Sequence, residues 1–124
     1  MAVVNVPVSL YVHIPFCRIK CTYCAFNTYV NLDALIEPFL QALRREIQIV
    51  GQSQPGQMVG TIYIGGGTPS ILTPEQMDSI LTAVYSNFNV LSDVEVSMEA
   101  NPSDLNAPYL RALRGIGLNR VSIG

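Results

Sequence analysis

The sequence predicts an α/β fold in which parallel strands alternate with helices as βα units. Strand-like and helix-like segments alternate along the chain, and the helix-like segments repeat their apolar residues with a period of about 3.6. The strand-like segments alternate apolar and polar residues, which is typical of a sheet with one buried face. We therefore expect helices on the apolar face and a polar, aromatic face that lines a cavity. A one-sided antiparallel sheet is the alternative, but the helices between the strands disfavour it.

The first predicted strand spans Ser9–Ile14. Tyr11 and His13 share its polar face, and the apolar face holds Leu10, Val12 and Ile14. A long connection, residues 15–31, follows this strand and holds every cysteine of the chain. In β/α barrels, loops at the carboxyl ends of strands carry the catalytic groups, so this connection is well placed for a site.

The first predicted helix begins between Asp33 and Pro38, and its apolar stripe consists of Phe39, Leu43, Ile47 and Val50. The second strand, Val59–Ile64, follows it and leads directly into a run of glycines. The second helix has clear start signals, because Thr73 is a predicted N-cap, Pro74 stands at the first position and Gln76 closes a capping box. Its apolar stripe consists of Met77, Leu81, Val84 and Phe88.

The third predicted strand, Val94–Ala100, has a polar face and an apolar face. The polar face holds Glu95, Ser97 and Glu99, and the apolar face holds Val94, Val96 and Met98. The short helix that follows is expected to begin at an Asn106 cap, to bury Leu110 and Leu113, and to end at Gly117. The fourth strand, Arg120–Ile123, places Val121 and Ile123 opposite Arg120 and Ser122. Each strand–helix–strand step is therefore expected to be a right-handed parallel unit.

Composition excludes several classes of protein. Of the 124 residues, 49% are hydrophobic and the mean hydropathy is +0.32, so the chain is not disordered. No uncharged apolar run reaches the length of about 18 residues that a membrane span needs. With seven Lys and Arg residues and a net charge of −2, the chain lacks the basic surface typical of nucleic-acid binding.

Three cysteines, Cys17, Cys21 and Cys24, lie close together in the first connection. Three thiolates can ligate an iron–sulfur cluster and leave one iron open to a non-protein ligand, which implies chemistry at that iron. The alternatives are buried apolar cysteines and a zinc site that adds His13. The close spacing favours the cluster, because structural zinc sites usually draw their ligands from two separate turns and His13 lies in a predicted strand.

Two further features indicate a ligand at the same edge of the sheet. The turn Gly65-Gly66-Gly67-Thr68 lets the backbone approach a ligand closely, although it lacks the pattern of a phosphate loop or a dinucleotide fingerprint. Glu99, at the end of the third strand, can accept hydrogen bonds from a ligand. A tight turn without a ligand and a solvated charge are the respective alternatives.

These segments together resemble a known family. The Cys-x3-Cys-x2-Cys run, with Tyr23 before its third cysteine, is similar to the signature of the radical S-adenosylmethionine (SAM) enzymes. Four segments resemble one branch, the oxygen-independent coproporphyrinogen III oxidases and the HemW-type haem chaperones: Leu10–Cys17, Gly65–Ser70, Met98–Pro102 and Gly117–Gly124. The resemblance implies that the βα units form the first half of a partial TIM-type radical SAM barrel.

The resemblance also implies the cofactors and their ligands. It implies a 4Fe-4S cluster on Cys17, Cys21 and Cys24, and reductive cleavage of SAM to a 5′-deoxyadenosyl radical with an electron from an external donor. The residues expected to contact SAM are Tyr11, Tyr23, Gly66, Gly67, Thr68 and Glu99. No haem ligand follows from it, and we interpret His13 as a core residue with a satisfied hydrogen bond.

Two functions compete within this branch. Its oxidases, which convert coproporphyrinogen III to protoporphyrinogen IX, carry a fourth cysteine two residues after the third, and this position is Phe26 here. The run Cys24-Ala25-Phe26-Asn27 resembles the haem chaperones, which bind haem and pass it to haem-accepting proteins, although Ala25 replaces their usual acidic residue. We therefore favour the chaperone over the oxidase. Outside this family, a zinc-binding interaction module is the alternative.

The ends of the sequence lead to two expectations. A parallel strand that ends the chain near Gly124 leaves a bare sheet edge, which natural proteins avoid, so residues 1–124 are expected to be the N-terminal part of a radical SAM core domain, truncated at its C-terminal end. The short segment before the first strand leaves no room for a signal peptide, and an open cluster needs a reducing compartment, so we expect a cytoplasmic protein.

Overall fold

The computed structural model describes residues 6–17, 29–30 and 33–124. At its centre is a four-stranded sheet in the order β1-β4-β5-β6, made of β1 (Val8–Ile14), β4 (Met58–Gly66), β5 (Asn89–Ala100) and β6 (Arg120–Ile123). Every neighbouring pair in this sheet is parallel. The connections hold α1 (Ile36–Ser53), α2 (Pro74–Asn87) and α3 (Ala107–Gly115). The predicted parallel βα units are confirmed, and the antiparallel alternative is excluded.

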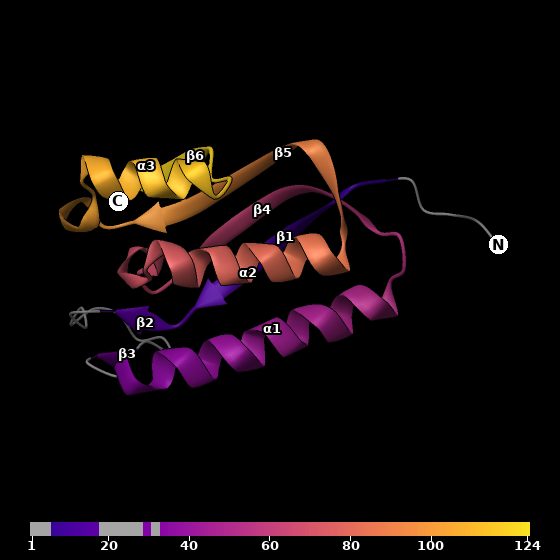
Figure 1. Cartoon of the computed structure of the whole chain (residues 1–124), viewed down its shortest axis with the longest axis horizontal. Coiled ribbons are helices and arrows are strands. Elements are labelled where there is room, and N and C mark those ends of the chain that lie inside the picture. The colour runs from indigo at the N-terminus through magenta and orange to yellow at the C-terminus, as the bar shows by residue number, and fades with distance from the viewer. Residues whose placement is uncertain (1–5, 18–28, 31–32) are drawn as a thin grey trace.

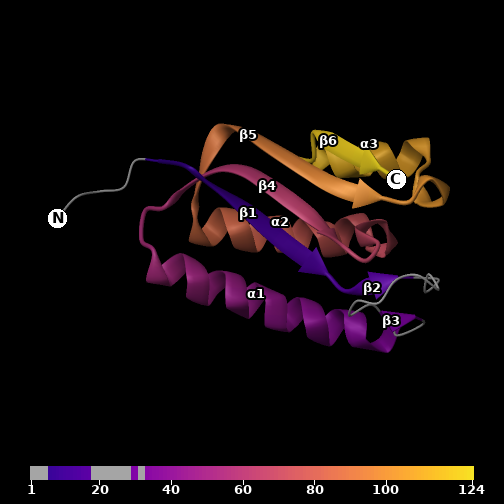
Figure 2. The same ribbon diagram turned by 180° about the vertical axis from the view of Figure 1, so that it is seen from behind.

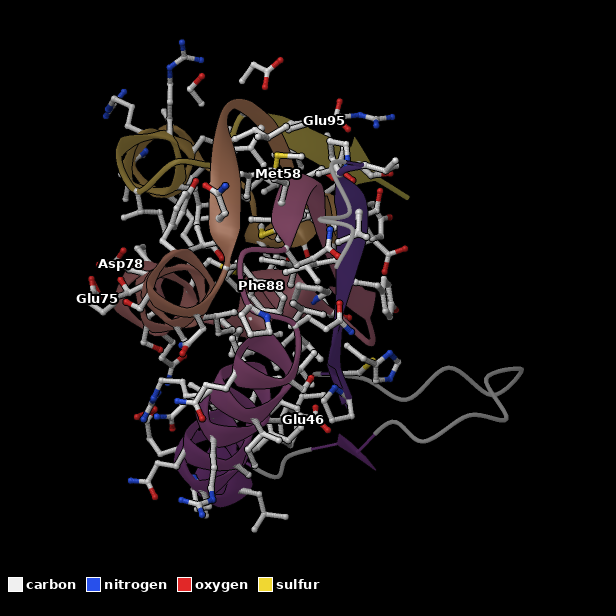
Figure 3. The ribbon with its side chains drawn as sticks, turned by 90° about the vertical axis from the view of Figure 1, so that its right-hand side faces the viewer. Glu46, Met58, Glu75, Asp78, Phe88 and Glu95 are labelled. Carbon is white, nitrogen blue, oxygen red and sulfur yellow. The ribbon has the colours of Figure 1, made fainter. Side chains whose placement is uncertain are left out.

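All three of these helices lie on one face of the sheet (Figure 1). Seen from behind, the strands lie in front, and no helix from the described part of the chain covers them (Figure 2). An edge-on view shows the same layering: Glu75 and Asp78 lie on the outer side of α2, and Glu95 lies on the side of the sheet away from the helices (Figure 3). The sheet therefore has one covered face and one open face.

The short elements lie at the ends of the strands. After Pro15 the chain continues from β1 into β2 (Phe16–Cys17), which pairs in parallel with β3 (Tyr29–Val30). The 3-10 helix η1 (Asp33–Leu35) precedes α1, while η2 (Pro69–Ile71) and η3 (Pro102–Asp104) follow β4 and β5. The carboxyl edge of the sheet is thus built from β2, η2 and η3.

The core lies between the sheet and the helices, as the alternation predicts. The strands contribute Val12, Ile14, Val59, Ile62, Ile64, Val94, Val96 and Met98, all buried. The helices contribute Ile36, Leu40, Leu43, Ile47, Met77, Ile80, Leu81, Val84 and Leu113. Burying these side chains removes apolar surface from water, which is the main force that holds the helices on this face.

The predicted cap signals are confirmed. The Thr73 side chain accepts a hydrogen bond from the Gln76 backbone N–H at 3.1 Å, and the Gln76 side chain accepts one from the Thr73 backbone at 2.9 Å. Asn106 Oδ1 accepts from the Tyr109 N–H at 2.9 Å. Gly117 has a φ of +115°, and two backbone hydrogen bonds of 3.1 Å, from the N–H groups of residues 117 and 118 to the carbonyls of residues 114 and 113, close α3 as a Schellman motif.

Some sequence expectations are wrong in detail. β5 begins at Asn89, five residues before the predicted start at Val94. In α1, Val50 is 40% exposed and lines the cavity between β1 and α1, whereas Gly51 is buried. A Cβ at Gly51 would lie 2.4 Å from the Asn87 carbonyl oxygen, so the close approach of α1 to the end of α2 needs a glycine there. Leu110 in α3 is likewise 38% exposed instead of buried.

A membrane-spanning helix is absent from the described part of the chain, since none of its helices combines sufficient length with sufficient apolar character.

Candidate functional site

The candidate site lies at the carboxyl edge of the sheet. β1, β4 and β5 are adjacent and parallel, so their carboxyl ends meet there (Figure 2). The chain carries Cys17 just beyond β1, the glycine turn of residues 65–68 at the end of β4, and Glu99 at the end of β5. The structure therefore brings together three features that the sequence predicted separately.

The glycine turn is hydrogen-bonded along the backbone that carries Cys17. The Gly67 N–H donates to the Ile14 carbonyl at 2.6 Å, and the Thr68 N–H donates to the Phe16 carbonyl at 2.7 Å. The Thr68 hydroxyl donates to Cys17 Sγ at 3.5 Å. The position of this cysteine is thus coupled to the turn in β4.

Close approach to this backbone explains the glycines themselves. A Cβ at Gly67 would lie 2.4 Å from the Phe16 carbonyl oxygen and 3.0 Å from Cys17 Sγ. Gly66 has a φ of +115°, and a Cβ there would lie 2.7 Å from the Ile14 carbonyl oxygen. Contacts within the protein already require Gly66 and Gly67, so the glycines by themselves do not distinguish a ligand-binding turn from the alternative of a tight turn without a ligand.

Glu99 is hydrogen-bonded to the same turn. Its Oε1 accepts from the Gly66 N–H at 2.8 Å, a bond to an ionised acceptor that is stronger than one between neutral groups. A Cβ at Gly65 would lie 2.8 Å from Glu99 Oε1, so this glycine leaves room for the carboxylate. Gly65 belongs to the predicted turn but not to the expected SAM contacts, and the structure shows that it makes room for the carboxylate.

Tyr11 and His13 lie on the open face of β1. Tyr11 is 58% exposed, and its hydroxyl and His13 Nδ1 share a hydrogen bond of 3.1 Å. His13 is exposed too, so its interpretation as a core residue is wrong. The strand alternation places it opposite the buried Ile14, and it borders a cavity of about 510 Å³ between β1 and α1.

A residue that the sequence analysis missed, Tyr63 in β4, lies next to Tyr11. Their rings are stacked, with centroids 6.0 Å apart and planes at 17°. Burial raises the pKa of both phenols above the ordinary value, and the negative charge of Glu99 adds to the rise in each. Both hydroxyls therefore stay neutral at physiological pH and can donate hydrogen bonds.

Of the three predicted cluster ligands, the structure describes only Cys17. Cys21, Cys24 and Tyr23 lie outside the described residues, and Cys17 is partly exposed. Among the described residues, no group of three or more His, Cys, Asp or Glu side chains is placed to hold a metal ion. The Cys17 thiol is partly exposed at the open edge and accepts from the Thr68 hydroxyl, which fits one ligand of a cluster whose other two ligands would be Cys21 and Cys24.

The fold and this edge define a class of protein. A parallel βα sheet with helices on one face, and with a cysteine, a glycine turn and a carboxylate at its carboxyl edge, has the arrangement of part of a β/α barrel, in which this edge is where ligands bind. The profile of the Radical SAM superfamily matches residues 11–124, and the chain belongs to this superfamily.

Comparison with individual proteins narrows the family. The chain is 39% identical over 121 residues to the heme chaperone HemW of Mycobacterium tuberculosis, a match that covers 95% of this chain and 31% of the relative. It is 40% identical over 118 residues to the oxygen-independent coproporphyrinogen III oxidase of Bradyrhizobium diazoefficiens, covering 94% of this chain and 26% of the relative. The chain therefore spans a third or less of the length of these relatives.

The solved structure of coproporphyrinogen III oxidase (HemN) from Escherichia coli, described as a radical SAM enzyme, is similar with a TM-score of 0.87 at 36% identity. The match covers 95% of this chain and 27% of that one, and confirms the predicted half-barrel fold. Membership in the family implies a 4Fe-4S cluster and SAM as cofactors. Since chaperones and oxidases match at nearly equal identity, the comparisons assign the family and not the function within it.

Proposed function

We propose that the protein is a haem chaperone of the radical SAM superfamily. The observation that carries this proposal is Phe26, which occupies the position of the additional cysteine in the oxidases that the sequence resembles. A phenyl ring can neither ligate a metal nor take part in thiol redox chemistry. One departure, Ala25 in place of the usual acidic residue, keeps the oxidase as the second candidate.

The cofactor site is proposed on the residues at the carboxyl edge. Cys17, Cys21 and Cys24 would hold the cluster, which when bound supplies an electron to SAM. The glycine turn and Glu99 would bind SAM beside it. The hydrogen bond between Gly66 and Glu99 supports this proposal, because it directs a carboxylate acceptor towards the turn at the open edge. The other proposed SAM contacts are Tyr11, Tyr23, Gly67 and Thr68.

The same proposal implies a cellular location and partner proteins. An open cluster needs an electron donor and a reducing compartment, so we place the protein in the cytoplasm with a partner that reduces it. A haem chaperone also needs haem-accepting proteins as partners.

The cluster assignment is tested by replacing each cysteine with Ala and measuring iron and sulfide after anaerobic reconstitution. With three ligands and no further cysteine in the chain, each variant should lose most of its iron. Ser86→Ala, on the exposed surface of α2, is the control and should keep wild-type iron. A Cys→Ala variant with wild-type iron would contradict the ligand assignment.

The functional assignment is tested with porphyrins. The reduced, SAM-supplied protein should bind haem, followed at the Soret band, and should form no protoporphyrin from coproporphyrinogen III under anaerobic conditions. The Escherichia coli oxidase is assayed in parallel as the positive control. Multiple-turnover formation of protoporphyrin would establish the oxidase instead, and failure to bind haem would overturn the chaperone.

A further inference from the structure

Tyr63 lies between the two open-face residues that the proposed function assigns to SAM. Tyr63 pairs with Tyr11 of β1 on one side and with Ser97 of β5 on the other, because its strand, β4, lies between β1 and β5. Glu99 lies one step further along β5, on the same face as Ser97. Parallel strands thus place Tyr63 next to both Tyr11 and Glu99.

The ring of Tyr63 is held by packing. It stacks on the Tyr11 ring at 6.0 Å between centroids. Its other side reaches the space above Gly65, where a Cβ would lie 2.9 Å from Tyr63 Cε2 and 2.8 Å from Glu99 Oε1. The hydroxyl end of the ring and the carboxylate therefore share the space that the glycine leaves open.

The hydroxyl end of Tyr63 faces Glu99 of β5 and Ser122 of β6, two residues that pair in the sheet register. The interaction with Glu99 raises the pKa of the phenol, which is the direction expected for a hydroxyl beside a carboxylate. The interaction with Ser122 lowers that pKa. The Gly66 N–H donates to the same carboxylate at 2.8 Å.

We propose that Tyr63 is a positioning residue for SAM, which acts by holding the Glu99 carboxylate in its binding orientation. This inference rests on the proposed function, in which Glu99 contacts SAM. A carboxylate held by both the Gly66 N–H and the Tyr63 hydroxyl has fewer side-chain conformations to lose when the ligand binds. The preorganised carboxylate should therefore bind SAM more tightly than a free one.

The test is a double-mutant cycle on the anaerobic, cluster-loaded protein, with SAM affinity measured by calorimetry. Tyr63→Phe keeps the stacked ring and removes the hydroxyl, and should weaken SAM binding about tenfold, which corresponds to about 1.4 kcal/mol. Glu99→Gln should weaken it at least as much. If Tyr63 acts through Glu99, the double variant should match Glu99→Gln within about twofold. Tyr85→Phe, at an exposed position on α2, is the control and should bind SAM normally.

A second readout does not depend on SAM. In protein labelled with ¹³C at tyrosine Cζ, the Tyr63 signal, assigned by its loss in Tyr63→Phe, should shift in Glu99→Gln but not in Glu75→Gln on α2. Wild-type SAM affinity in Glu99→Gln would overturn the proposed SAM site itself. If Glu99→Gln weakens SAM binding but Tyr63→Phe keeps wild-type affinity, only the positioning role is overturned. The same holds if the effects of the two substitutions are independent in the double variant.

Discussion

Substituting Gly67 by Ala tests whether the glycine turn and Cys17 are mechanically coupled. The added Cβ would lie 2.4 Å from the Phe16 carbonyl oxygen, about 1 Å closer than the 3.4 Å at which ordinary contacts begin. It would also lie 3.0 Å from Cys17 Sγ. The nearest neighbour is backbone and not the end of a flexible side chain, so β2 and the turn must move apart.

The cost of that movement follows from the contacts it breaks. Separating the two segments weakens the hydrogen bonds from the Gly67 and Thr68 N–H groups, which measure 2.6 and 2.7 Å. Each is worth about 0.5–1.5 kcal/mol, and overpacking adds about 1–3 kcal/mol. We therefore expect a loss of about 2–6 kcal/mol, a large fraction of the stability of about 5–15 kcal/mol that is typical of a domain.

Two measurements check this expectation. Urea unfolding of the cluster-free protein should show a midpoint lower by about 1 M or more, given slopes of about 1–3 kcal/mol/M. Iron content after anaerobic reconstitution should fall, because Cys17 is displaced. Gly115→Ala is the matched control, since nothing lies within 4 Å of a Cβ at that position. If Gly67→Ala unfolds and loads iron like Gly115→Ala, the coupling between turn and cysteine is refuted.

Three other predictions follow from the same edge of the sheet. Ser70 is 4% exposed, and its hydroxyl donates to Asp104 at 2.7 Å and accepts from the Asn101 N–H at 3.1 Å, so Ser70→Ala should cost about 1–3 kcal/mol in urea unfolding while Ser86→Ala costs nothing measurable. Gly66→Val should weaken SAM binding in calorimetry, because it combines a φ of +115° with a Cβ 2.7 Å from the Ile14 carbonyl; wild-type affinity would remove the turn from the SAM site. The folded protein favours the neutral form of Tyr63, and this raises the pKa of the phenol above its ordinary value of 10.0. The resulting contribution to folding stability is fully present below pH 10.0 and is lost as the pH rises through the folded-state pKa. Unfolding of Tyr63→Phe should therefore depend less on pH above about 10 than that of the wild type, and identical profiles would contradict the shift.

The sequence by itself determined the βα order, the buried faces of β1 and β5 and the caps of α2 and α3, whereas Ile123 on the predicted apolar face of β6 is 60% exposed. These features depend on residues close together in the chain, as in the reciprocal bonds of Thr73 and Gln76 or the Schellman bonds at Gly117. The cysteine spacing and Phe26, on which the proposed function depends, are likewise properties of the sequence. Parallel topology then placed Cys17, the glycine turn and Glu99 at one edge, because the carboxyl ends of parallel strands meet.

Only the tertiary structure decided what each of these residues contacts. Strand register brought Tyr63 beside Tyr11 and Glu99, and the turn at Gly67 against Phe16, although each partner is distant in the sequence. The packing of α1 beside α2 buried Gly51 and left Val50, a residue of the predicted stripe, 40% exposed, and His13 is exposed on the open face. Periodicity specifies which way a side chain points, but register and helix crossing depend on how all the elements pack together, and no local pattern contains that information.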